Sequence, residues 1–285
     1  MKNTPFYVKK YSGELELFSS DKLRKSLERS GADAIIIDSI IETIYQELYD
    51  GVTTKEIYKK AFRLLKKANR ISASKYSLKR AIFDLGPTGY PFEQLVGALL
   101  KEKGYKTQVG VLVAGECVTH EIDVLAEKEG NTFTIECKFH TNAKTVSNIK
   151  VPLYINSRFK DVQKKWNANP NKTSFLKQGW IVTNTRFTED ALKYGKSAGL
   201  VLISWNYPIN NGISKNIDKY GLYPITTLTS LTKRGKTLLI EKDIILTQDI
   251  LTSRDELEKL HISATKINKI LSEAKQLCDT KLTLN

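Results

Sequence analysis

The stretch that most constrains the fold runs from His120 to Lys138 and reads HEIDVLAEKEGNTFTIECK. It contains two runs of alternating apolar residues separated by a short turn over residues 127–130. This pattern predicts a β-hairpin. Residues two apart in a strand lie on one face, so we expect the hairpin to present Asp123, Glu136 and Lys138 together.

Two carboxylates and one amine are the groups that metal-assisted hydrolysis requires. Mg²⁺ takes oxygen ligands, usually one or two protein carboxylates, with water and substrate phosphate in the other positions. Asp123 and Glu136 are the candidate ligands, and the backbone carbonyl of Cys137 is a third. Lys138 would orient or deprotonate the attacking water, or neutralise charge developing on the phosphate.

The competing interpretation of this pattern is a solvated face of alternating charges. Glu136 and Lys138, however, interrupt a strand that is otherwise free of charge. A buried carboxylate is costly unless it is paired or metal-bound. The surroundings therefore favour a site over a solvated face.

The segment from Gly115 to Lys138, with its HEID and TIECK motifs, resembles the active-site hairpin of the PD-(D/E)xK nucleases, in particular of the Mrr-like restriction endonucleases. Residues 90–105 resemble the opening helix of that group. Residues 179–194 and 199–205 resemble its later strand, helix and strand. Four ordered blocks make this a fairly specific resemblance.

The resemblance implies a restriction-endonuclease-like α/β core, in which helices flank a central mixed sheet. It also implies endonucleolytic cleavage of phosphodiester bonds in DNA, dependent on Mg²⁺ or Mn²⁺. The catalytic residues it implies are Glu93, Asp123, Glu136 and Lys138, with Glu93 on the first helix helping to hold metal or water. Complementing the helix dipole is the other role open to Glu93.

Charge is the second strong feature, since the 285 residues carry a formal net charge of +14. Such an excess favours an anionic partner, usually nucleic acid or nucleotide. Residues 138–177 hold nine Lys or Arg against one acid, Asp161. Apolar residues at helical spacing there predict basic residues on an exposed helix flank, namely Arg158, Lys160, Lys164 and Lys165. We expect this face to bind DNA, and a solvated basic face without a partner is the alternative.

Other sequence features exclude several classes of protein. No run of about 18 apolar residues occurs, and the N-terminus lacks an apolar signal core, so we expect a cytoplasmic protein with no membrane partner. Three cysteines without CxxC spacing argue against a disulfide framework and a zinc cluster.

Residues 1–86 are predicted to form a separate, mainly helical unit that begins with a small β-hairpin. Residues 19–21 and 53–54 are predicted to cap two of its helices, and residues 73–85 are predicted to supply a further helix. The motif order is VxKxxG, strand, two helices, Gly-x-Thr-Thr, helix and Tyr-x-x-x-Arg-Ala-Ile-Phe. This order resembles the ATP-cone, the nucleotide-sensing domain of ribonucleotide reductases and of their transcriptional repressor.

The ATP-cone resemblance implies that a nucleoside triphosphate, ATP or dATP, binds as an allosteric ligand. The matching positions are Val8, Lys9, Lys10, Glu16, Lys22, Thr54 and Phe83. Lysine ammonium groups would neutralise the phosphates. The P-loop motif is absent, so ATP hydrolysis is not implied. Asp84 stands near a position where some members carry a basic residue, and a degenerate cone kept for dimerisation is the alternative.

The rest of the chain is predicted to be a linker and a helical tail. Residues 86–91 are rich in Gly and Pro and divide residues 1–86 from a nuclease domain over 87–234. Residues 224–231 are expected to close that domain with a helix. In the helical segment 235–285, residues 257–274 resemble half of a helix-hairpin-helix, and a packing or dimerisation pair of helices is the alternative. His120, His140 and His261 are expected to be incidental.

Together these features predict a nucleotide-regulated, metal-dependent DNA endonuclease, acting in restriction or defence against foreign DNA. We expect a homo-oligomer, a dimer or larger. The alternative is a nucleotide-responsive DNA-binding regulator that uses the nuclease fold only as a platform. The intact set of Asp123, Glu136 and Lys138 favours the enzyme. Cleavage specificity and the sign of the nucleotide effect stay open.

Overall fold

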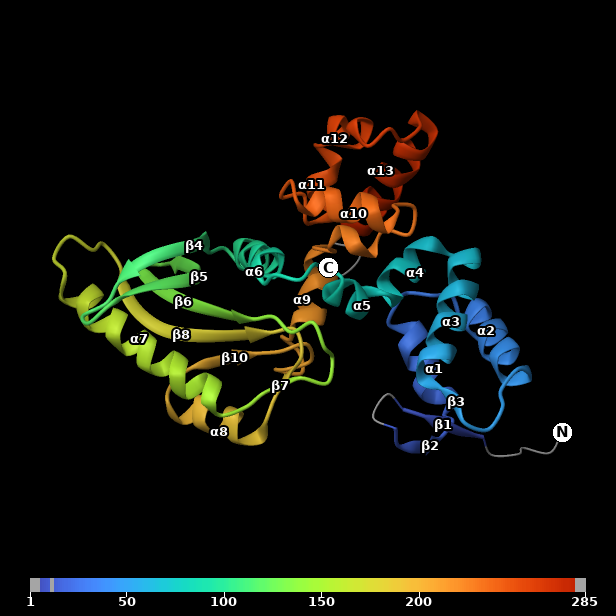
Figure 1. Ribbon diagram of the computed structural model, residues 1–285, viewed down its shortest axis with the longest axis horizontal. Coiled ribbons are helices and arrows are strands. Elements are labelled where there is room, and N and C mark those ends of the chain that lie inside the picture. The colour runs from blue at the N-terminus through green and yellow to red at the C-terminus, as the bar shows by residue number, and fades with distance from the viewer. Residues whose placement is uncertain (1–5, 11–12, 280–285) are drawn as a thin grey trace. The chain divides into compact units, whose positions relative to one another are not determined.

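The computed structural model describes residues 6–10 and 13–279 (Figure 1). The chain divides into two compact units, Met1–Lys79 with Thr227–Thr232, and Arg80–Thr226 with Lys233–Asn285. Residues 11 and 12 of the predicted first turn, and the extreme ends of the predicted first and third domains, lie outside the described residues. The predicted domain boundaries therefore stay predictions.

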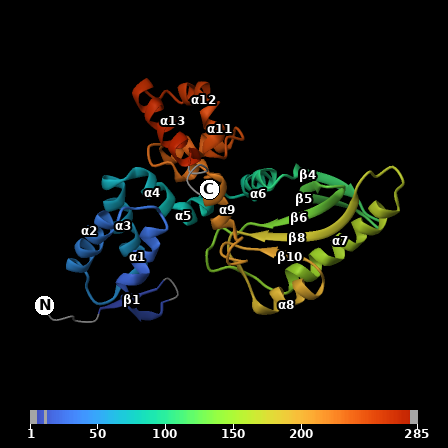
Figure 2. The ribbon, with the colours of Figure 1, turned by 180° about the vertical axis from the view of Figure 1, so that it is seen from behind.

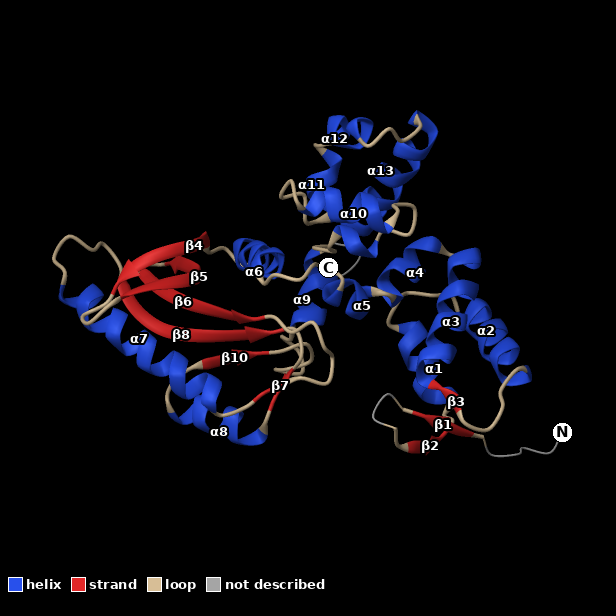
Figure 3. Cartoon of the chain, viewed as in Figure 1, coloured by secondary structure: helices blue, strands red, loops and turns tan. Residues whose placement is uncertain are grey.

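The first unit combines a small sheet with helices (Figure 3). Strand order in the sheet is β2-β1-β3, with β1 antiparallel to β2 and parallel to β3. Side chains of Ser19 and Thr53 cap α1 and α3, and Thr53 forms a capping box with Glu56. The elements are β1 (Tyr7–Lys9), β2 (Leu15–Leu17), α1 (Ser20–Glu28), α2 (Ala34–Gln46), β3 (Val52–Thr53), α3 (Thr54–Ala68) and α4 (Arg70–Tyr76).

The second unit is built on a five-stranded sheet of order β10-β8-β6-β5-β4. Strands β4, β5 and β6 are antiparallel neighbours, whereas β8 and β10 continue in parallel with β6. The strands are β4 (Lys106–Ala114), β5 (Thr119–Lys128), β6 (Asn131–Lys138), β8 (Phe175–Thr183) and β10 (Val201–Ile203). A separate pair joins β7 (Val146–Ser147) and β9 (Arg186–Phe187).

Helices cover both faces of this sheet. Helix α6 (Tyr90–Glu102) lies on one face, and α7 (Lys150–Ala168) and α8 (Glu189–Ser197) lie on the other (Figures 1 and 2). The predicted mixed sheet flanked by helices is confirmed. The turn between β5 and β6 has positive φ at Glu129 and Gly130, the backbone of the tight turns that suit a two-residue hairpin.

The C-terminal part of the second unit is helical, as predicted. Its elements, after α5 (Leu78–Phe83) near the start of the unit, are α9 (Ile213–Tyr220), α10 (Lys233–Ile240), α11 (Thr247–Leu251), α12 (Arg254–Lys259) and α13 (Ala264–Cys278). Helix α9 ends at Gly221, where φ is +64° and an added Cβ would lie 2.7 Å from the Cys278 carbonyl. Within the described ranges, no helix is both long and apolar enough to span a membrane.

Two helix predictions are wrong. Residues 224–231 form only a three-residue 3-10 turn, Ile225–Thr227. β-Branched threonines are poor helix formers, and the carbonyls of Thr226 and Thr229 accept hydrogen bonds from lysine side chains instead. The single helix predicted over 73–85 is divided at Ser77, whose hydroxyl donates to the Ser74 carbonyl, so that α4 and α5 are separate.

Candidate active site

The candidate site lies where two strands separate. β5 and β6 are paired from their turn up to Val124 and Ile135, and beyond that point β6 is paired only with β8. Asp123 Oδ2 accepts a hydrogen bond from the Cys137 amide at 2.6 Å. A carboxylate thus takes the place of the next backbone carbonyl in the ladder. The first residue beyond the last pair on β6 is Glu136.

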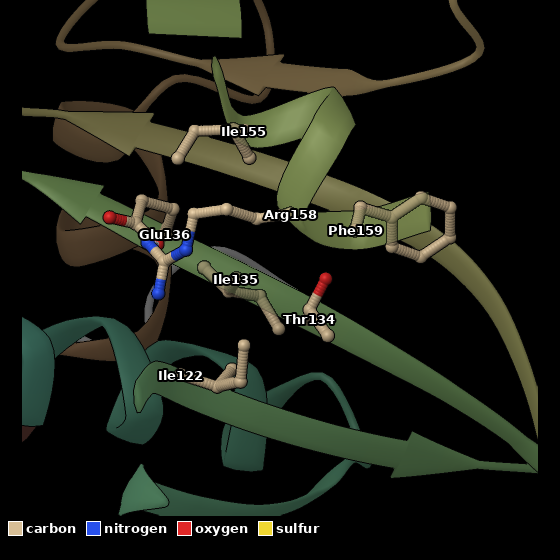
Figure 4. Close-up of a pocket in the computed structure, with 7 residues that line it drawn as sticks. All are labelled: Ile122, Thr134, Ile135, Glu136, Ile155, Arg158 and Phe159. Atoms are coloured by element: carbon tan, nitrogen blue, oxygen red, sulfur yellow. Dashed lines mark hydrogen bonds and ion pairs between the residues drawn. The ribbon is translucent and has the colours of Figure 1, made fainter. Parts of the chain in front are cut away.

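Glu136 is the most enclosed member of the site, with its side chain 9% exposed. Its Oε1 accepts from Lys138 Nζ at 2.6 Å, and its Oε2 accepts from Arg158 Nη1 at 2.7 Å. Figure 4 shows the Arg158 side chain extending from α7 to Glu136 on β6. Both carboxylate oxygens are therefore paired with cations.

Arg158 does not lie on the exposed helix flank, and that prediction is wrong. Its side chain is only 15% exposed. Its Nη2 donates to the Glu121 carbonyl on β5, and its Nε to His120 Nδ1 at 3.4 Å. Arg158 therefore bridges the gap between β5 and β6. Lys160, Lys164 and Lys165 of the same helix are exposed, as predicted.

His120 was expected to be incidental but links Arg158 to Asp161. Its Nε2 lies 2.8 Å from Asp161 Oδ2, with the proton position dependent on the tautomer. The Asp161 carboxylate also accepts from the Cys117 and Val118 amides, at 2.8 and 3.4 Å. Its contact with His120, together with the Cys117 amide, holds the Asp161 pKa well below its usual range.

Gly115 is required by this arrangement. An added Cβ would lie 2.0 Å from Asp161 Oδ2 and 2.7 Å from the Val118 carbonyl. The turn between β4 and β5 can therefore wrap the Asp161 carboxylate only because residue 115 has no side chain. This gives a physical reason for the glycine that opens the hairpin motif.

Several carboxylates lie close together at the site, and the pKa values of two of them are raised. Burial, followed by the neighbouring Asp123, Glu121 and Glu136, raises the pKa of Glu93 to about 7. Burial and then Glu136 raise the pKa of Asp123 to about 6, against the lowering effect of the Cys137 amide, Lys138 and Arg158. The carboxylates are thus close enough to disfavour one another's ionisation.

The donor set fits a divalent cation of the Mg²⁺ type. Over residues 6–10 and 13–279, no group of three or more His, Cys, Asp or Glu is arranged to hold a metal ion. Mg²⁺ is nevertheless commonly bound by only one or two carboxylates, with water and phosphate completing its shell. Asp123 and Glu136 supply that number. The Cys137 carbonyl stays a predicted third ligand.

Side chains at the end of β8 and just after it form hydrogen bonds with the backbone at the end of β6 and just beyond it. The Asn184 side-chain amide donates to the His140 carbonyl and accepts from the His140 amide, both at 2.8 Å. Thr183 Oγ1 donates to the Lys138 carbonyl at 2.8 Å. Thr183, the last residue of β8, and Asn184, which follows it, are both fully buried. These contacts hold the backbone of Lys138 in position.

The pocket between Glu136 and α7 is small. Its cavity volume is about 10 Å³, room for about one water molecule. It is lined by Ile122, Thr134, Ile135, Glu136, Ile155, Arg158 and Phe159 (Figure 4). A nucleobase does not fit in this pocket.

The first unit holds a second charged cluster, formed by three of the predicted nucleotide-binding residues. Lys10 Nζ and Lys22 Nζ each pair with one carboxylate oxygen of Glu16. Val8 is buried in the small sheet, whereas Lys9 and Thr54 are exposed. Phe83 belongs to the second unit.

Comparisons with known proteins agree with the architecture of the second unit. A family model described as restriction endonuclease matches residues 87–206, and one described as AF1548-like, C-terminal, matches residues 223–278. An uncharacterized protein of Archaeoglobus fulgidus is 37% identical over 180 residues, covering 63% of this chain and 97% of that protein.

Solved structures were also compared. The crystal structure of a protein of unknown function, AF1548, is 35% identical, with a TM-score of 0.55, covering 67% of this chain and 99% of that one. The MspJI restriction endonuclease in complex with a 27-mer oligonucleotide is 12% identical, covering 60% of this chain and 35% of that one. Its TM-score of 0.28 is too low to support an argument.

Proposed function

This chain belongs to the AF1548-like protein family, and from that premise we propose that it is a divalent-metal-dependent endonuclease that hydrolyses phosphodiester bonds in DNA. Residues 87–206 form a restriction-endonuclease-like domain. The family relative and the solved family structure are described only as uncharacterized and of unknown function. The activity therefore has to be argued from the site.

The observation that carries the proposal is the meeting of Asp123, Glu136 and Lys138 where β5 and β6 part. Asp123 and Glu136 would hold the ion, together with the Cys137 carbonyl. A bound Mg²⁺ or Mn²⁺ would supply Lewis-acid activation of the phosphate and of water. Lys138 would then orient or deprotonate the attacking water, with Glu93 helping to hold metal or water.

DNA recognition would use the basic face within residues 138–177. Lys160, Lys164 and Lys165 are exposed on α7, the helix that carries Arg158. Lysines on such a face contact phosphates without reading sequence. Each phosphate contact contributes about 0.9 to the slope of log affinity against log salt, so binding should weaken steeply as salt rises.

The experiment is incubation of supercoiled plasmid with the full chain and Mg²⁺. We expect cleavage by the wild type and a loss of at least about 100-fold for Asp123→Asn, Glu136→Gln and Lys138→Ala, the scale of losing one essential acid, base or electrostatic group. Glu127→Gln, an exposed acid on the same hairpin, is the matched control. Retained DNA binding by the three variants, measured by fluorescence anisotropy, separates chemistry from recognition.

The alternative function is a non-catalytic DNA-binding regulator. It predicts tight, salt-dependent DNA binding by the wild type and no Mg²⁺-dependent cleavage at all. Equal cleavage by wild type and Asp123→Asn would instead assign the activity to other residues or to a contaminant.

We further propose that the first unit is an ATP-cone that binds ATP or dATP and regulates cleavage through assembly into dimers or larger oligomers. The convergence of Lys10 and Lys22 on Glu16 supports this, because it gathers two ammonium groups at one point. Phosphate oxygens could replace the carboxylate there. A role in restriction or defence against foreign DNA would follow from such regulation.

A further inference from the structure

Arg158 belongs to none of the motifs on which the proposed function rests, yet its guanidinium contacts residues of both strands of the site. Its three guanidinium nitrogens reach Glu136, the Glu121 carbonyl and His120. These partners come from both of the strands that separate there. The Arg158 guanidinium is thus the group that links β5 to β6 where the two strands separate.

The position of this guanidinium has a chemical consequence. Arginine keeps its proton under ordinary conditions, so Arg158 remains a cation beside Glu136. Arg158 on Oε2 and Lys138 on Oε1 each occupy one lone pair of the Glu136 carboxylate. An incoming ion therefore competes with these two cations for the carboxylate.

Lys138 and Arg158 differ in how firmly they are held. The Lys138 side chain is 31% exposed and Arg158 is 15% exposed. Arg158 is further anchored through His120 to Asp161, whose carboxylate is held by the Cys117 and Val118 amides. The arginine is therefore the more rigid competitor for Glu136.

We propose that Arg158 is a positioning residue that acts as the resident counter-ion of Glu136 and competes with the divalent ion for its carboxylate. This inference rests on the proposed function, since it concerns the same metal site. In the metal-free protein Arg158 keeps the buried carboxylate neutralised and holds β5 beside β6. When the site is loaded, the ion competes with the guanidinium for this carboxylate.

The test is a calorimetric titration of the full-length, metal-free protein with Mn²⁺ at low ionic strength, in the absence of DNA. Arg158→Gln removes the competing charge, and we expect it to bind Mn²⁺ about tenfold more tightly than the wild type. Arg158→Lys keeps the charge and should stay close to the wild type. Lys160→Gln removes an exposed charge from the same helix and is the matched control.

A second variant guards against poor folding of Arg158→Gln. Asp161→Asn weakens the anchor behind His120 while leaving Arg158 in place, so its Mn²⁺ affinity should rise by about twofold, a modest effect of an outer contact. Circular dichroism spectra and thermal unfolding curves without metal establish that each variant is folded.

The outcomes separate this inference from the proposed function. If the wild type binds Mn²⁺ in an Asp123-dependent manner but Arg158→Gln binds no more tightly, the counter-ion role is overturned and the metal site stands. A purely structural Arg158 predicts that result, with a lowered Tm. If the wild type shows no Asp123-dependent Mn²⁺ binding, both proposals fail.

Discussion

The two units each contain a glutamate that is paired with two cations, and the contrast between the two clusters is instructive. Glu136 is paired with Lys138 and Arg158, and the exposed fractions of these side chains are 9%, 31% and 15%. Glu16 is paired with Lys10 and Lys22, and the corresponding fractions are 31%, 36% and 71%. The chemistry is the same, but the solvent exposure differs.

This difference in exposure changes what each cluster can do. Exposed ion pairs contribute about 0–1 kcal/mol and are screened by salt. Enclosed pairs contribute little net stability, but breaking one leaves a charge uncompensated at a cost of about 3–5 kcal/mol. The Glu136 cluster is therefore costly to disrupt, whereas the Glu16 cluster can open at little cost to admit an anion.

The largest expected effect comes from removing each central glutamate. Glu136→Ala leaves Lys138 and Arg158 facing each other, and we expect a loss of about 3 kcal/mol in the free energy of unfolding of the second unit. Glu16→Ala should cost the first unit less than about 1 kcal/mol. Urea unfolding followed by circular dichroism measures both. Similar losses for the two variants would remove the distinction between the clusters.

A smaller effect is expected from pH at Glu93, which lies near Glu136. The pKa of Glu93 is raised to about 7 from its ordinary 4.5, first by burial. The folded state therefore binds this proton more tightly than the unfolded chain. The resulting stability is fully present below about pH 4.5 and is lost as pH rises through about 7.

The measurement is the thermal unfolding of metal-free protein at a series of pH values. Since Glu93 is half-buried, we expect its contribution to be about 1 kcal/mol, or about 2–4 °C in Tm. Glu93→Gln should remove this part of the slope between pH 4.5 and 7. A Glu93→Gln profile parallel to that of the wild type would show that the folded state does not raise the pKa of Glu93.

The smallest effect on stability is expected from the exposed cluster. Lys10→Ala with Lys22→Ala should change the free energy of unfolding of the first unit by less than about 1 kcal/mol. The same double variant should weaken ATP or dATP binding by at least about tenfold, because two phosphate-neutralising groups are lost. Calorimetry measures the dissociation constant, with Lys67→Ala, at an exposed lysine elsewhere in the first unit, as the control. An unchanged constant would argue against a nucleotide site.

The sequence alone predicted the architecture of the second unit well. Alternating apolar runs and a tight turn indicated the β5–β6 hairpin, because a hairpin depends on local patterns. The mixed sheet was implied by the resemblance to the nuclease family. The caps at Ser19 and Thr53 were also predicted from residue type. Residues 224–231 do not form the predicted helix, and the low helix propensity of their threonines is the physical reason.

The support of the site was not predicted, because it depends on contacts between distant segments. Arg158 was predicted to be exposed because it is charged. It nevertheless lies three residues after Ile155 and four before Val162, both buried, and this helical spacing was the available signal. Nothing local in the sequence indicated that Asp161 would lie against Gly115, since that contact depends on the packing of α7 against the β4–β5 turn.

One hydrogen bond described above gives the molecule a built-in spectroscopic reporter. The Cys137 amide donates its hydrogen bond to the side-chain carboxylate of Asp123 and not to a backbone carbonyl of β5. Its exchange with deuterium should therefore follow the state of that carboxylate, while the amides of the paired residues in the same strand follow the opening of the sheet. The NMR signal of this one amide would therefore distinguish metal binding at Asp123 from general opening of the sheet.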